Sequence, residues 1–140
     1  MTIELVPLAT MRFTLGVPLF VPDTPRGTRV VVEVTDGAID GERIHARQKG
    51  VAAADWLTLD AGGLGTLDVR VIFETDDSAL IYVTYSGRLD LSGGPGTAPS
   101  YIAPLLDVGD TRYGWLAKIQ AVGKRAIDGQ NLTYEAYELR

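Results

Sequence analysis

The chain has 140 residues, no cysteine, one histidine and a net charge of −5. The lack of cysteine excludes disulfides and thiolate metal sites, and the single histidine argues against hydrolytic metal centres and Ser-His catalytic machinery. The acidic balance argues against nucleic acid and anionic membranes as partners. Because no basic leader and no run of about 18 apolar residues is present, we expect a single cytoplasmic domain spanning residues 1–140.

The first predicted strands show an alternation of apolar and polar residues. The pattern runs over residues 9–15 and again over residues 29–35, where valines occupy one face. A period of two is typical of half-buried strands. Turn-forming residues lie between the two runs at 22–27 and follow the second run at Asp36-Gly37, as expected for short strands joined by turns.

The first candidate site is Asp55 beside Trp56, directly after the small-residue run 51–54. A carboxylate packed against an indole is desolvated and could transfer protons. Trp56 would then form part of a pocket wall. The alternative is a turn-capping Asp next to a core Trp, because Asp is common in turns for purely local hydrogen-bonding reasons.

The strand predicted over residues 66–75 carries the densest cluster of charge. Alternation places Asp68, Arg70 and Glu74 on one face and apolar side chains on the other. An arginine can hold one carboxylate ionised while a second, more desolvated one keeps a raised pKa, which gives a base and an acid side by side. The alternative is a solvated outer face whose ion pairs contribute only about 0–1 kcal/mol each.

Aromatic side chains form a third group of candidates. Tyr82 and Tyr85 lie on the strand that follows, and Arg112, Tyr113 and Trp115 occur together later in the chain. Tyrosine and tryptophan combine apolar bulk with one polar group, which suits a pocket for an oxygenated ring. The same residues are also common in cores and interfaces, so both interpretations stay open.

The spacing of the turns indicates the fold class. Turn signals recur roughly every 8 to 12 residues, and no amphipathic run is long enough for a βα unit. A Gly- and Pro-rich tract at residues 91–99 cannot continue a strand and is expected to be a lid or a long connection. We predict an all-β fold, a single antiparallel β-barrel of about eight to ten strands with little helix.

Several short motifs, in order along nearly the whole chain, resemble the DUF3237 family, also labelled UPF0311. Each motif is short, but their joint occurrence at suitable spacing is fairly specific. They are Ala54-Asp55-Trp56, Leu67-Asp68-Val69-Arg70, Phe73-Glu74-Thr75-Asp76-Asp77, Leu80-Ile81-Tyr82-Val83, Arg112-Tyr113-Gly114-Trp115-Leu116, Ala121-Val122-Gly123 and Tyr137-Glu138.

The resemblance implies a β-barrel that commonly forms homo-oligomers, in a family whose general function is unassigned. For some fungal relatives it implies a cofactor-independent cyclase that adds a hydroxyl across an activated double bond. The family's polar pattern falls on Asp55, Asp68, Arg70, Glu74 and Tyr82, and it favours placing that polar face in the barrel lumen. The chain departs from the pattern where polar family residues are replaced, as at Leu57 and Ala117, so the substrate does not carry over.

Together these features lead to one main hypothesis, an enzyme of the lyase, isomerase or cyclase type that needs no metal or cofactor. Carboxylates and Tyr82 would transfer protons on a small oxygenated apolar substrate, and Arg70 would stabilise oxyanion charge. The alternative is a non-catalytic small-ligand-binding barrel, and a third interpretation is a structural domain with a filled barrel. A cavity of about 300 Å³ or more containing Asp68, Arg70 and Tyr82 would favour the first two.

The assembly is the last expectation from the sequence. A small barrel with exposed aromatic side chains can bury an apolar outer face in a two-fold interface. We therefore expect a homodimer that binds a small molecule.

Overall fold

Ten strands and one short helix make up the described part of the chain, which is residues 1–94, 99–126 and 131–140 of the computed structural model. With 66% of the residues in strands and 6% in helix, the predicted all-β class is confirmed. Residues 95–98 of the predicted Gly- and Pro-rich connection lie outside the described residues. The elements are β1 (Leu5–Leu15), β2 (Leu19–Thr24), β3 (Gly27–Asp40), β4 (His45–Gln48), β5 (Ala54–Leu59), β6 (Leu64–Thr75), β7 (Leu80–Asp90), β8 (Ser100–Val108), the 3-10 helix η1 (Thr111–Lys118), β9 (Ala121–Ala126) and β10 (Leu132–Leu139).

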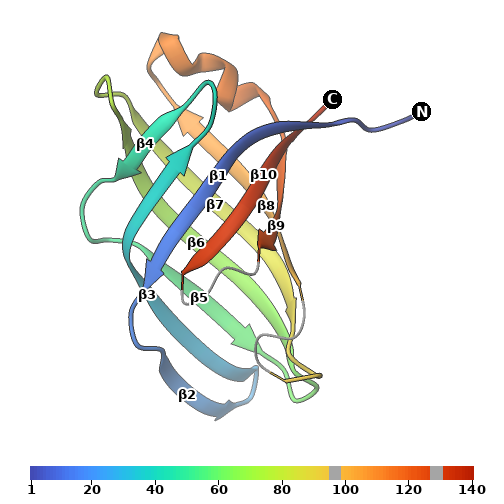
Figure 1. Ribbon diagram of the computed structural model, residues 1–140. Coiled ribbons are helices and arrows are strands. Elements are labelled where there is room, and N and C mark those ends of the chain that lie inside the picture. The colour runs from blue at the N-terminus through green and yellow to red at the C-terminus, as the bar shows by residue number, and fades with distance from the viewer. Residues whose placement is uncertain (95–98, 127–130) are drawn as a thin grey trace.

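Antiparallel pairing closes the strands into an eight-stranded barrel with two additional strands (Figure 1). The order around the ring is β1, β10, β9, β8, β7, β6, then β4 and β5 in one shared position, then β3, which pairs again with β1. β4 and β5 both lie between β3 and β6, and each pairs with a different part of them. The predicted antiparallel barrel is therefore confirmed.

Alternation on each strand decides which side chains fill the lumen. On β6, Val69, Val71 and Phe73 are at most 1% exposed, whereas Asp68 and Arg70, which alternate with them, are exposed on the outer face. Closing the sheet leaves a narrow interior that excludes water only if its side chains are apolar. The apolar face of each strand of the closed barrel therefore points inward, whereas the additional strand β2 is exposed.

Aromatic rings pack at the centre of the barrel. The Phe13 ring lies 6.2 Å from that of Phe73, 6.1 Å from that of Tyr85 and 6.4 Å from that of Tyr134, measured between ring centroids. Tilted and edge-on contacts at such distances suit the charge distribution of the rings. This cluster divides the lumen into two halves that differ in content.

One half of the lumen is closed by η1, at the end of the barrel where both termini lie (Figure 1). Leu116 of η1 is fully buried and packs with Leu8, Met11, Ile39 and Ile44 around a void of only about 10 Å³. This end of the barrel is therefore filled with side chains. None of the helices in the described ranges is long and apolar enough to span a membrane.

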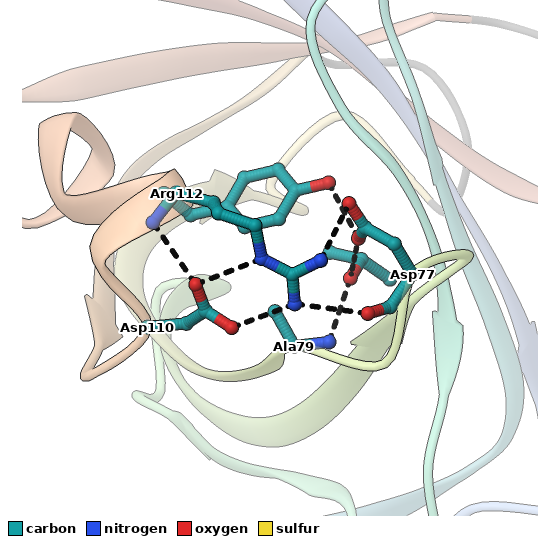
Figure 2. A network of polar contacts seen from close by, with 6 residues as sticks. Asp77, Ala79, Asp110 and Arg112 are labelled. Atoms are coloured by element: carbon teal, nitrogen blue, oxygen red, sulfur yellow. Dashed lines mark hydrogen bonds and ion pairs between the residues drawn. The ribbon is translucent and has the colours of Figure 1, made fainter.

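A polar network holds η1 against the β6–β7 turn (Figure 2). The Arg112 guanidinium donates to the Asp110 carboxylate at 2.7 and 3.0 Å and lies 3.1 Å from the Asp77 carboxylate. Tyr113 donates its hydroxyl proton to Asp77 at 2.7 Å, and Thr75 does so at 2.6 Å. The contacts of Arg112 and Tyr113 with Asp77 connect segments that are 35 and 36 residues apart in sequence and fix the closed end.

Candidate functional site

The other half of the lumen contains a mostly aliphatic cavity of about 150 Å³. It lies at the end of the barrel where β1, β5 and β9 end and where β8 and β10 begin (Figure 1). Its polar side chains are few and come from different strands. The lining residues are Leu15, Val32, Val34, Asp55, Leu57, Leu67, Val69, Tyr85, Leu89, Ser100, Arg125, Leu132 and Tyr134.

Asp55 is the one carboxylate among the described residues that line the cavity. It lies on β5 directly opposite Val69 of β6, and its Oδ1 accepts a hydrogen bond of 3.1 Å from the backbone N–H of Asp68. Burial among aliphatic side chains raises the pKa of Asp55 from 3.8 to about 6, because the charged form loses hydration. The hydrogen bond from Asp68 opposes this shift, and the nearby Asp68 charge adds to it.

Two tyrosines form the floor of the cavity. Tyr85 of β7 and Tyr134 of β10 are 4% and 2% exposed, and their ring centroids lie 5.8 Å apart in an edge-on arrangement. Burial raises the pKa of both hydroxyls, and the charge of Asp55 raises them further. Both phenols are therefore neutral near pH 7, so each can donate a hydrogen bond to a ligand or to a neighbouring hydroxyl.

Arg125 brings a positive charge to the same cavity. It lies near the end of β9, opposite Tyr134 in the ladder with β10, and its charge lowers the pKa of Tyr134. Since the charge of Asp55 raises that pKa, Tyr134 experiences both charges. One small ligand in the cavity can thus contact Asp55, both phenols and Arg125.

The prediction that the charged face of β6 points into the lumen is wrong. Asp68 and Arg70 form an exposed ion pair of 3.4 Å, and Glu74 pairs at 3.3 Å with Lys49 on the outer surface. Tyr82 is 42% exposed on the same outer face. The cause is the opposite face of β6. Burying its apolar side chains is favourable, whereas moving the charged side chains from water into the lumen would cost free energy.

The other candidates divide between the cavity and the outer surface. Tyr85 lies in the cavity, as described above, whereas Trp56 is exposed and packs under the Arg70 guanidinium at 5.0 Å. Trp115 lies on η1 beneath Arg43, with the guanidinium carbon 4.0 Å from the ring centroid. Like Arg112 and Tyr113, it is at the closed end and does not line the cavity. Of the ten candidate residues, the structure therefore brings Asp55 and Tyr85 together in the cavity.

Sequence reasoning did not identify Ser100, Arg125 and Tyr134. Tyr134 could have been found from the alternation along residues 132–138, which places it on the inner face with Ala136. Arg125 gave no such signal, because a lone arginine at a strand end is common on surfaces. Within residues 1–94, 99–126 and 131–140, no three His, Asp or Glu side chains are grouped so that they could hold a metal ion.

Comparisons with known proteins give a family and several solved structures of similar fold. The family model described as "Protein of unknown function (DUF3237)" matches residues 3–139. A β-barrel-like protein from Acinetobacter baumannii is 29% identical, with a TM-score of 0.87 over 99% of this chain and 97% of that one. The comparison with curated proteins gives no match.

Two further structures share the fold at lower identity. A conserved protein of unknown function from Rhodopseudomonas palustris is 22% identical, with a TM-score of 0.88 over 99% of both chains. A structure described as an enzyme from Penicillium herquei is 20% identical, with a TM-score of 0.78 over 99% of this chain and 94% of that one. At these identities the likeness concerns the fold.

Proposed function

The chain belongs to the DUF3237 family, and from this premise we propose that it is a cofactor-independent enzyme in which Asp55 transfers a proton on a small oxygenated molecule bound in the lumen cavity. One observation carries the proposal. Asp55 is a carboxylate inside an aliphatic cavity, with a pKa raised to about 6 by burial. A carboxylate exposed to water is a much weaker base, because hydration stabilises its charge.

The raised pKa suits general acid–base catalysis. Proton transfer is most efficient when the pKa of the catalytic group is close to the working pH. With a pKa of about 6, most of Asp55 is ionised at pH 7 and is still a stronger base than an ordinary aspartate. It can therefore accept a proton from a substrate and return it in the same catalytic cycle.

The two phenols supply the complementary part of the chemistry. When Asp55 removes a proton from the carbon next to a carbonyl, the C–H electron pair moves into the new C=C bond and negative charge develops on the carbonyl oxygen. Neutral phenol groups at Tyr85 and Tyr134 can stabilise that oxygen by hydrogen bonds. Return of the proton at another atom completes an isomerisation, and loss of a leaving group or ring closure completes a lyase or cyclase reaction.

The size of the cavity limits the substrate. A volume of about 150 Å³ is below the roughly 300 Å³ of typical drug-sized sites and corresponds to a cavity that holds one benzene ring. The expectation of a cavity of about 300 Å³ or more around Asp68, Arg70 and Tyr82 is therefore not met. The proposed substrate places a single oxygenated ring in the lumen. The Penicillium herquei protein of the same fold, described as an enzyme, adds support for catalysis.

The test is proton exchange on simple cyclic ketones. Cyclohexanone and 2-cyclohexenone are incubated with the protein in D₂O, and deuterium incorporation at the acidic carbon is followed by NMR. The wild type should accelerate exchange over buffer, and Asp55→Asn should lose at least about a hundredfold, the lower range for a general base. Glu74→Gln, which removes a carboxylate on the outer face, is the matched control and should exchange like the wild type.

Two results contradict the proposal: no acceleration by the wild type with either ketone, or equal acceleration by Asp55→Asn. A loss of exchange in Glu74→Gln alone would place the base on the outer face of β6.

The aliphatic character of most of the lining favours one second candidate, a non-catalytic carrier of a small apolar ring. A carrier would bind these ketones in the cavity without exchanging their protons.

A further inference from the structure

Arg125 differs from every other arginine of the chain. It is half-buried, whereas the other arginines, all within the described residues, are exposed. No carboxylate of the described residues lies within ion-pair distance of its guanidinium, and the guanidinium donates no hydrogen bond to a described group. A cation that is partly removed from water and lacks a partner destabilises the folded state, because lost hydration is not replaced.

Arg125 and Asp55 lie on opposite walls of the cavity. β5 and β9 are separated by three strands in either direction around the ring, namely β6, β7 and β8 or β3, β1 and β10. The two side chains line one cavity, and none of the ion pairs among the described residues joins them. A ligand in the cavity therefore meets a carboxylate at one end, a guanidinium at the other and aliphatic walls between them.

This arrangement leads to the class of ligand. Resting on the proposed function of the same cavity, we infer that the substrate is a single-ring molecule with an anionic oxygen group, a carboxylate or an acidic enol or phenol, that binds to the unpaired guanidinium of Arg125. The planar guanidinium can donate two parallel hydrogen bonds to such oxygens. The opposite edge of the ring then faces Asp55, where a proton is removed.

Tyr134 supports the same orientation. It lies opposite Arg125 in the β9–β10 ladder and forms part of the floor beside Tyr85. An anionic oxygen held by the guanidinium is therefore within the region that the Tyr134 hydroxyl can reach. Arg125 and Tyr134 would then stabilise both the charge of the bound ligand and the charge that develops during the reaction. Both charges would lie on the side of the ring away from the carboxylate of Asp55.

The experiment compares benzoate with benzamide, which has the same shape and no charge, by isothermal titration calorimetry at pH 7.5. The wild type should bind benzoate at least about tenfold more tightly, a moderate value for charge-assisted hydrogen bonds. Arg125→Gln should lose this preference and keep its affinity for benzamide within about twofold, and Arg125→Lys should keep part of it. Arg88→Gln, which changes an exposed arginine of β7, is the matched control and should bind like the wild type.

Equal affinity of the wild type for the two probes, or a preference for benzoate that survives in Arg125→Gln, overturns the inference. The proposed function can fail separately. If benzoate is preferred through Arg125 but no ketone exchanges its protons, the anion site stands and the catalytic role of Asp55 falls. If ketone exchange depends on Asp55 and neither aromatic probe binds, the inference falls and the proposed function stands.

Discussion

Asp55 and Asp68 are joined by a hydrogen bond of 3.1 Å from the Asp68 backbone N–H to the Asp55 Oδ1 atom, yet their side chains lie on opposite faces of the sheet. Asp55 lines the lumen cavity, and Asp68 is exposed on the outer surface. Burial raises the pKa of Asp55 to about 6. Two neighbouring carboxylates therefore have different environments because the barrel wall separates them.

The first prediction concerns stability and pH. The pKa of Asp55 is about 6 in the folded protein, against an ordinary value of 3.8, so between these pH values the folded state binds more protons than the unfolded chain. The free energy of unfolding therefore falls as pH rises from about 4 to 6, and the full destabilisation by ionised Asp55 is present above pH 6. Asp55→Asn removes this cost and keeps an oxygen to accept the Asp68 N–H. It should stabilise the protein at pH 8 by on the order of 1–3 kcal/mol.

Urea unfolding at pH 8 and at pH 4 measures this difference. The stabilisation by Asp55→Asn should be largest at pH 8 and small at pH 4, where the native carboxyl is already protonated. Asp68→Asn on the outer face should change stability by less than about 0.5 kcal/mol at both pH values. An Asp55→Asn variant that is no more stable than the wild type at pH 8 would mean that Asp55 is not desolvated.

The second prediction compares two arginines that the sequence placed in a site. Arg112 joins η1 to the β6–β7 turn through the Asp110 and Asp77 carboxylates, whereas Arg70 makes one exposed ion pair of 3.4 Å. Arg112→Met should lower the melting temperature clearly, because the closed end loses its anchor. Arg70→Met should change it by little more than the measurement error. Equal melting temperatures for the two variants would argue against a structural role of the network.

The third prediction separates binding from catalysis. Tyr85→Phe removes a hydroxyl from the cavity floor and keeps the ring packing against Phe13 and Tyr134. We expect deuterium exchange on the ketone substrates to fall by about a hundredfold or more, in line with the loss of one oxyanion donor. The affinity for benzamide should change little. Exchange at the wild-type rate in Tyr85→Phe would exclude this hydroxyl from the reaction.

The fourth prediction concerns assembly. The outer face of β6, β7 and β8 carries exposed Ile72, Tyr82, Tyr101 and Leu105, and apolar patches of this kind are common in interfaces. We expect a homodimer formed through this face and predict that Tyr82→Arg, which places two like charges near a two-fold axis, yields monomers. Val17→Arg, at an exposed position on the connection between β1 and β2, should leave the dimer intact. Light scattering of a wild-type protein with a monomeric mass would refute this expectation.

The fold could be predicted from the sequence because alternation and turn spacing act locally on every strand. The orientation of β6 was mistaken for a different reason. Alternation gives two faces, and the resemblance favoured the polar one for the lumen, although Leu67, Val69 and Phe73 on the other face had more surface to bury. In a narrow barrel, the apolar face determines the orientation.

The cavity could be predicted only in part. Asp55 was identified, but its raised pKa comes from burial in the lumen and not from Trp56, which lies outside under Arg70. Arg125 and Tyr134 face the same cavity as Asp55 only when β10 pairs with β1 and closes the ring. That contact joins residues from opposite ends of the chain, and no local pattern in the sequence reports it.

Whether the lumen cavity raises the pKa of Asp55 is tested most directly by an NMR titration of its side-chain carboxyl carbon. The protein is labelled with ¹³C-aspartate, and the resonance is assigned by comparison with Asp55→Asn. We predict that this resonance titrates with a midpoint of about 6, because the carboxylate is held inside the lumen cavity. A midpoint near the ordinary aspartate value of 3.8 would show that Asp55 is fully hydrated, and the proposed proton transfer in the cavity would have to be abandoned.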